Sequence, residues 1–174
     1  ETVHAWILAA VNGHTDQAPK DKRTCVRVLY SRDKGQDYHV DLAIYGMKSN
    51  VAYLAEKGKA SWPESDPKAF IDWFETHIKN KGDQLRRIVC YLKALSDYNQ
   101  KQAPMLNGIS ITIISVEQLV VSDKDDKSLV ETVKRISQQI KTSKQIKKPV
   151  TPYENLIQGW SEDEISKLCK RLDI

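Results

Sequence analysis

The run Tyr38-His39-Val40-Asp41-Leu42-Ala43-Ile44-Tyr45 alternates with a period of two, which is the period of a β-strand. One side of this strand carries Tyr38, Val40, Leu42 and Ile44. The other side carries His39, Asp41, Ala43 and Tyr45. If the first set packs on a core, the Asp41 carboxylate points away from that core at a fixed position. A carboxylate held in this way is suited to binding a metal ion, and it is also a common solvent-facing strand residue.

A second strand precedes this one. Residues 23–30 are rich in β-branched side chains, and residues 31–37 between the two strands are polar and contain Gly35. Two strands joined by such a segment form a hairpin. The sequence therefore predicts an antiparallel pair in which one strand carries Asp41.

Most of the remaining chain has helical periodicity. Residues 3–11 form one predicted helix, which ends near Asn12-Gly13. Asp66-Pro67 is a favourable helix start, and apolar residues recur at helical spacing over residues 67–79, 83–101 and 126–142. Ser161 and Glu164 have the spacing of a capping box, which opens a last helix.

Composition restricts the class of protein. The 174 residues are 40% hydrophobic and 29% charged, with a net charge of +4, so the chain can supply the core of one domain or parts of two lobes. The charge suits a protein that handles nucleotides or RNA. A basic run is read as a solvated helix face, and it contains Lys134, Arg135, Lys141, Lys144, Lys147 and Lys148.

The sequence offers no sign of a membrane or of disulfide bonds. Cys25, Cys90 and Cys169 lie far apart without the spacing of a metal site, which indicates a reducing compartment and a cytoplasmic protein. Two of the three lie in apolar-periodic surroundings and are expected to be buried thiols. No apolar run is long enough to span a bilayer, and no signal peptide is visible.

Several segments, in order, resemble one family. They are Cys25-Val26-Arg27-Val28, Tyr38-His39-Val40-Asp41-Leu42, Ser65-Asp66-Pro67, Trp73-Phe74, Leu85-Arg86-Arg87-Ile88-Val89 with Tyr91-Leu92-Lys93, Asn107-Gly108-Ile109-Ser110, and Lys148-Pro149-Val150. Together they resemble the bacterial CD-NTases, relatives of cyclic GMP-AMP synthase that make cyclic oligonucleotide signals in anti-phage defence. The resemblance covers residues 20 to 156 and rests on the order and spacing of the segments.

The chain also departs from the family pattern. The family has a Gly-Ser turn and a paired Asp-x-Asp on the strands before this region, and neither is present here. The chain begins with Glu1. We therefore expect a C-terminal portion of such an enzyme, inactive alone because one aspartate cannot hold two metal ions.

The resemblance implies the polymerase-beta-like nucleotidyltransferase fold, of class α+β, with a short antiparallel sheet packed on a mostly helical lobe. Residues 1–60 would be the remaining part of the catalytic sheet lobe, and residues 61–174 the helical lobe that closes the nucleotide cleft. Residues 109–116 alternate and are β-branched, which favours a strand. The resemblance places a helix there, and we follow it because tertiary context overrides local propensity.

The resemblance also assigns site residues. In the family three aspartates hold two Mg²⁺ or Mn²⁺ ions, and Asp41 matches the third. Two such ions activate the attacking hydroxyl and stabilise the leaving oxygens. Lys93 matches a lysine that contacts the nucleotide triphosphate, and Asn107 replaces a family serine that touches phosphate. Arg86 shares a helix face with Lys93 and is a weaker candidate for nucleotide binding. We expect His39 to pack or to support Asp41.

The implied activity joins ATP, GTP or other ribonucleoside triphosphates into a cyclic di- or trinucleotide. The resemblance leaves room for an activating protein partner, and RNA binding is not favoured. Two alternatives stay open. One is a template-independent enzyme that adds nucleotides to RNA ends, and the other is a non-catalytic relative that binds nucleotide, RNA or protein.

Overall fold

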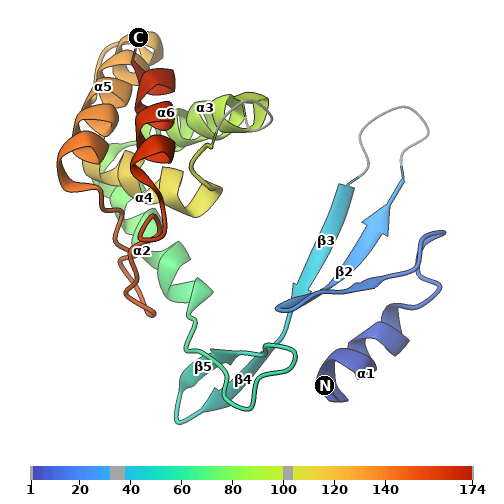
Figure 1. Ribbon diagram of the computed structural model, residues 1–174. Helices are drawn as coiled ribbons and strands as arrows, with labels where there is room; N and C mark the ends of the chain where they lie inside the picture. Colours follow the sequence, from blue (N-terminus) through green and yellow to red (C-terminus); the bar gives the residue numbers. More distant parts are fainter. Residues whose placement is uncertain (1, 32–37, 100–103, 174) are drawn as a thin grey trace. The chain divides into compact units, whose positions relative to one another are not determined.

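The computed structural model describes residues 2–31, 38–99 and 104–173 (Figure 1). The chain divides into two compact units, Glu1–Asp66 and Pro67–Ile174. The first unit contains short antiparallel sheets and the second contains helices. The predicted α+β class is confirmed.

The first unit is built on a three-stranded antiparallel sheet. The helix α1 (Thr2–Val11) is followed by the strands β1 (Lys20–Asp21), β2 (Cys25–Tyr30) and β3 (Tyr38–Ala43), in the order β1-β2-β3. The predicted hairpin is confirmed, because β2 and β3 pair along their whole length. Residues 32–37 of the predicted connection lie outside the described residues.

The apolar side of β3 is more exposed than its pattern suggests. In β2, Val26 and Val28 are buried, whereas Tyr38 and Val40 of β3 are 44% and 43% exposed. The reason is the position of β3 at one edge of the described sheet, while α1 packs on β1 and β2. Alternation thus predicts the strand and which residues share a face, but not the burial of that face.

A second hairpin follows in a stretch whose sequence pattern is weak. It comprises β4 (Tyr45–Lys48) and β5 (Val51–Leu54). Ser49 and Asn50 between them both have positive φ angles, as the tight two-residue turn of a type I′ hairpin demands. The Trp62 ring lies against Gly46, where a Cβ atom would come within 2.8 Å of the ring. Only glycine leaves room for this contact.

A buried histidine ties α1 to the rest of the first unit. His4 is 3% exposed, and its Nδ1 lies 2.8 Å from the Asp21 carboxylate on β1. Its Nε2 lies 3.4 Å from the backbone oxygen of Ala55. Lys57 also pairs with Asp21. These contacts supply polar partners for an imidazole that is removed from solvent.

The described residues of the second unit form five helices: α2 (Pro67–Lys81), α3 (Gln84–Asn99), α4 (Gly108–Gln118), α5 (Asp125–Ser143) and α6 (Glu162–Leu172). The helix starts predicted at Pro67 and after Ser161 are confirmed, and α6 has the complete capping box. The predicted end of the third helix, at residues 100–101, lies outside the described residues. None of the described helices is long and apolar enough to cross a membrane.

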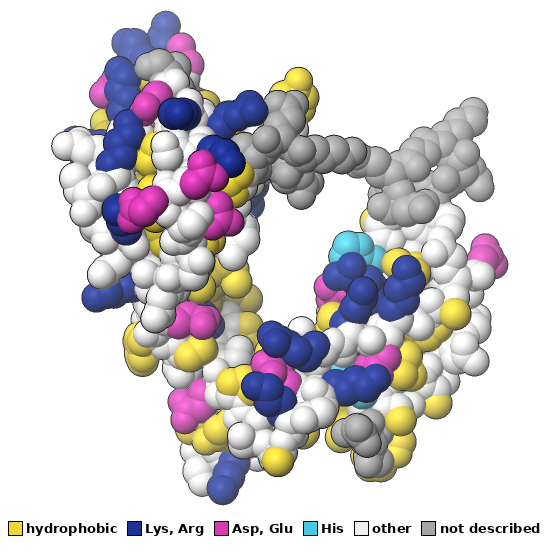
Figure 2. Space-filling model, in the orientation of Figure 1, with side chains coloured by type: hydrophobic (Ala, Val, Ile, Leu, Met, Phe, Trp, Pro, Cys, Tyr) yellow, Lys and Arg dark blue, Asp and Glu magenta, His cyan; other side chains and the backbone are white. Residues whose placement is uncertain are grey.

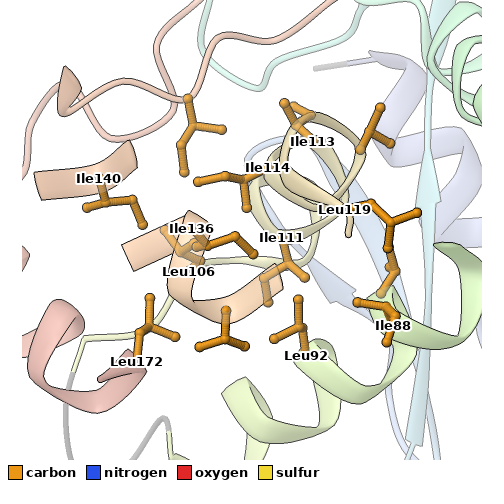
Figure 3. Packing of buried hydrophobic residues seen from close by; sticks show 14 of the residues in the cluster. Ile88, Leu92, Leu106, Ile111, Ile113, Ile114, Leu119, Ile136, Ile140 and Leu172 are labelled. Carbon is orange, nitrogen blue, oxygen red and sulfur yellow. The ribbon is translucent and has the colours of Figure 1, made fainter. Parts of the chain in front are cut away.

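The helix α4 lies at the centre of the second unit. Every residue from Ser110 to Val116 is buried, and Figure 3 shows isoleucines of α4 among Leu92 of α3, Ile136 of α5 and Leu172 of α6. Trp73, Phe74 and Trp160 pack against the same core. The helix predicted over residues 109–116 is confirmed. A helix that is covered on all sides is apolar all round, so tertiary burial overrides the strand propensity of this segment.

Truncation within α4 provides a test of this packing. Ile114 is 0% exposed, so Ile114→Ala should lower the free energy of unfolding by about 2–5 kcal/mol through lost burial and a residual cavity. Ile109 lies on the same helix and is 45% exposed. Ile109→Ala should stay within about 0.5 kcal/mol. Urea denaturation followed by tryptophan fluorescence measures both, and equal losses would contradict a central α4.

Candidate functional site

Asp41 lies in the middle of β3, directly opposite Arg27 on β2. Arg27 donates from Nε to Asp41 Oδ1 at 2.7 Å and from Nη2 to Oδ2 at 2.8 Å. The Arg27 side chain is 29% exposed and that of Asp41 38%. Cross-strand neighbours on one face are close enough for this contact, and the planar guanidinium matches both carboxylate oxygens at once.

The charge state of Asp41 follows from these neighbours. The hydrogen bonds from Arg27 lower the pKa of the Asp41 carboxyl below its usual value, against a smaller opposing effect of burial. The Nε2 of His39, on the same side of β3, lies 4.0 Å from Asp41 Oδ2. This places His39 in the supporting position expected of it. Burial raises the pKa of the neighbouring Cys25 thiol.

The described residues around Asp41 do not complete a metal centre. Within residues 2–31, 38–99 and 104–173, no group of three or more His, Cys, Asp or Glu side chains lies close enough to hold a metal ion. Both oxygens of Asp41 already accept hydrogen bonds from a cation. Mg²⁺ is bound through oxygen ligands, and this part of the chain offers one carboxylate with an arginine bound to it.

A separate pocket lies in the second unit, at the start of α4. Its volume is about 560 Å³, and it is lined by residues of α3, of the segment before α4 and of α4 itself. The lining includes Lys93, Ser96, Asp97, Asn107 and Gly108. The structure thus brings together two of the predicted site residues, Lys93 and Asn107.

Asn107 fixes the beginning of α4. Its side-chain oxygen accepts a hydrogen bond from the backbone N–H of Ser110 at 2.8 Å, and its backbone oxygen accepts one from Ile111 at 3.0 Å. Asn107 is therefore the N-cap of the helix. Helix geometry provides no partner for the next two N–H groups, those of Gly108 and Ile109. The Asn107 amide nitrogen is the part of this side chain that can donate to a ligand.

Lys93 approaches the same helix end. A Cβ atom on Gly108 would lie 3.5 Å from Lys93 Cε and 3.9 Å from Lys93 Nζ, so the ammonium group sits beside the first residue of α4. The N-terminus of a helix carries a partial positive charge, and the ammonium group adds a full one. The combination is a favourable place for an anion.

The other predicted residue, Arg86, is exposed on α3 and does not line this pocket. Ser96 and Asp97 do line it, and sequence reasoning missed both. A signal for them existed, because residues three and four after Lys93 lie on the same helix face. The Ser96 hydroxyl donates to the backbone oxygen of Leu106 at 2.9 Å, which ties α3 to the segment before Asn107.

The basic run on α5 and beyond does not gather into a single positive surface. Lys134 pairs with Glu131 at 2.8 Å, and Lys141 pairs with Asp173 at 2.8 Å. Figure 2 shows Lys and Arg side chains interspersed with acidic ones over this unit. Exposed pairs of this kind contribute little energy, so the run is a solvated surface, as its pattern indicates.

The Arg27–Asp41 contact predicts a pH dependence. Because the pKa of Asp41 is lowered in the folded state, the pair stabilises the fold near neutral pH, and this contribution is lost as the pH falls through the folded-state pKa. An NMR titration of the Asp41 carboxyl carbon should have a midpoint below the usual Asp value. Arg27→Met should raise that midpoint. Arg23→Met, which removes an arginine that lies 4.0 Å from Glu56 instead, should leave it unchanged, and an equal shift in both variants would contradict the assignment.

Comparison with known proteins identifies proteins that this chain resembles. No protein-family model matches the chain. It is similar to a cyclic GMP-AMP synthase of Escherichia albertii, with 25% identity over 116 residues, which is 64% of this chain and 26% of that protein. It is similar in structure to the Vibrio cholerae di-nucleotide cyclase DncV in complex with ATP and GTP, with a TM-score of 0.72 and 18% identity. DncV with a linear intermediate gives a TM-score of 0.71 and 20% identity.

The matches cover different shares of this chain and of the proteins it resembles. The two DncV structures are covered to 49% and 47% of their length by 98% and 95% of this chain. The chain thus spans about half of DncV and about a quarter of the curated relative. Over that span its fold is the nucleotidyltransferase fold of DncV. Together with the sequence similarity to a cyclic GMP-AMP synthase, this confirms that the chain resembles part of a CD-NTase.

Proposed function

We propose that the chain is the nucleotide-binding part of a nucleotidyltransferase that joins ribonucleoside triphosphates into cyclic di- or trinucleotides. The observation that carries the proposal is the pocket in which Lys93 meets the N-terminus of α4. The similarity to a cyclic GMP-AMP synthase, and to a cyclase whose structures contain ATP and GTP, supports nucleoside triphosphates as the ligands.

In this proposal Lys93 and the first residues of α4 have defined tasks. The Lys93 ammonium group pairs with the triphosphate, and the backbone N–H groups of Gly108 and Ile109 donate to phosphate oxygens. Asn107 holds the first turn of α4 in place through Ser110 and donates from its amide. Gly108 leaves the approach open, because it has no side chain beside Lys93.

The proposed role of the second unit is therefore to bind and orient the nucleoside triphosphate. Asp41 of the first unit is proposed as one carboxylate ligand of Mg²⁺ or Mn²⁺. Such ions neutralise phosphate charge and activate the attacking hydroxyl. Among the described residues no group of three or more His, Cys, Asp or Glu side chains could hold a metal ion, so the tasks proposed for this chain are binding and positioning. We propose on the same ground that these 174 residues alone are inactive.

The proposed setting is the bacterial cytoplasm, in signalling against phage. Cys25, Cys90 and Cys169 are free thiols, as expected in a reducing compartment. Residues 1–60 are proposed as part of the catalytic sheet lobe and residues 61–174 as the helical lobe. An activating protein partner fits this setting, and no described basic surface favours RNA.

Substitutions in the pocket test the binding step. Lys93→Met should weaken binding of a non-hydrolysable nucleoside triphosphate at least about tenfold, because it removes a charge-assisted contact. Lys79→Met, at an exposed lysine of α2, is the matched control and should have no effect. Isothermal titration calorimetry measures both variants. Equal affinities would contradict the assignment of the pocket.

Two substitutions at Asn107 distinguish its role as the N-cap of α4 from its proposed contact with the ligand. Ser and Asp are both good N-cap residues, so Asn107→Ser and Asn107→Asp should both keep α4 folded. Asn107→Ser should also keep triphosphate binding. Asn107→Asp should weaken it severalfold, because the added negative charge repels phosphate. If both variants bind as the unaltered chain does, Asn107 does not face the ligand.

Turnover tests the reaction itself. The protein, with any sequence encoded on either side of this chain, is incubated with the four ribonucleoside triphosphates and Mg²⁺ or Mn²⁺, and the products are identified by mass spectrometry. We expect a cyclic oligonucleotide that is lost in Asp41→Asn and kept in Asp72→Asn, an exposed position on α2. A product that persists in Asp41→Asn would remove Asp41 from the reaction. Extension of added RNA instead would identify an RNA-end enzyme.

A further inference from the structure

The first unit has a pocket of its own, on the hairpin of β4 and β5. Its volume is about 440 Å³, which falls in the range of sites for small ligands. Residues of both strands line it, together with Ala60, Ser61 and Trp62 from the segment that follows the hairpin. None of its lining residues has a task in the proposed function.

Three aromatic or charged side chains meet on one face of this hairpin. Gly46 lies directly opposite Tyr53, so the two residues share a face, and Lys48 shares it because it comes two residues after Gly46. The Trp62 ring occupies the space that Gly46 leaves open, where a Cβ atom would come within 2.8 Å of the ring. The face therefore presents an indole, a phenol ring and an ammonium group.

Backbone contacts hold Trp62 in this position. The backbone N–H of Leu54 donates to the oxygen of Pro63 at 2.9 Å, and Glu64 forms a β-bridge with Tyr53. The segment after Trp62 thus follows the edge of β5, and the indole is half-buried. A ring that is already held in place loses little further freedom when a ligand stacks on it.

Lys48 supplies the charge of this pocket. It is exposed at the end of β4, and within the part of the chain that the structure describes it forms no ion pair. Lys57 and Lys59 of the same unit, in contrast, pair with Asp21 and Glu56. One ammonium group balances one negative charge, whereas a triphosphate would leave several charges unbalanced here. The pocket therefore suits a ligand that carries a single negative charge.

We propose that this pocket binds a flat aromatic ring that carries one negative charge, with the ring against Trp62 and Tyr53 and the anionic group at Lys48. Flat rings stack on aromatic side chains with little dependence on their substituents, and the ammonium group adds a charge-assisted contact. A nucleotide phosphodiester and an aromatic carboxylate both have this chemistry. The site uses neither Lys93 nor Asn107, so it is independent of the proposed function.

The experiment uses the 174-residue chain and NMR of the tryptophan indole N–H groups. The probes are cyclic AMP, which joins a base to a phosphodiester, and naphthoate, which joins a ring to a carboxylate. Adenosine supplies a ring without a charge, and acetate a charge without a ring. At least one of the two charged rings should bind at Trp62 about fivefold or more tightly than adenosine and acetate do. The tighter of the two shows whether the site prefers a phosphodiester or a carboxylate.

Variants test the two kinds of contact separately. Lys48→Met should weaken binding of the charged ring about fivefold or more, whereas Lys20→Met, at an exposed lysine of β1, should leave it unchanged. Tyr53→Leu should weaken it severalfold through loss of a stacking ring. Trp62→Phe assigns the indole signal. Trp6 of α1 is 66% exposed, so its indole reports non-specific stacking in the same spectrum. Amide spectra without probe check that β4 and β5 remain paired.

Three results would overturn the proposal. Absence of a shift at the Trp62 indole with both charged rings would show that the pocket does not take this class of ligand. Equal shifts at the Trp6 and Trp62 indoles would show non-specific stacking. Equal affinity of Lys48→Met and the unaltered chain would remove the charge contact. Each measurement involves neither a nucleoside triphosphate nor turnover, so its failure is distinguishable from a failure of the proposed function.

Discussion

The second unit depends on the burial of the middle of one helix. Residues Ser110 to Val116 of α4 are all buried, so the helix is held by its neighbours on every side and its ends have fixed positions. Its N-terminus meets α3 at Lys93, where the Gly108 position lies within van der Waals distance of the lysine stem. Core packing therefore sets where the first turn of α4 lies relative to the backbone of α3 that carries Lys93.

The first unit relies on strand register in the same way. A shift of β3 by one residue would move every one of its side chains to the opposite face of the sheet, and Asp41 would lose Arg27. The pairing of Val28 with Val40 and of Val26 with Leu42 holds the register. Arginine at position 27 also explains why Asp41 can remain a charged residue on a partly exposed strand, since its charge is matched at the nearest cross-strand position.

The sequence predicts where the helices and strands lie along the chain better than it predicts which side chains they bring into contact. Periodicity and capping signals locate the helices and the hairpin because these depend on residues close together in the chain. The helix at α4 runs against its own β-branched composition, and only the family resemblance identifies it. The Arg27–Asp41 contact could not be predicted, because the long connection between β2 and β3 leaves the register open. Lys93 and Asn107 were both predicted, but their shared pocket depends on how α3 and α4 pack. Ser96 was within reach, since helical spacing places it beside Lys93.

The two candidate sites differ in electrostatic character, and this difference has a consequence for binding. The pocket at α4 combines the ammonium group of Lys93 with the positive end of a helix, a combination that favours an anion. The face around Asp41 presents a pair whose charges cancel, so it has little attraction for either ion separately. The pocket at α4 is therefore the proposed site for a nucleoside triphosphate, whereas the Arg27–Asp41 pair joins two neighbouring strands of the first unit.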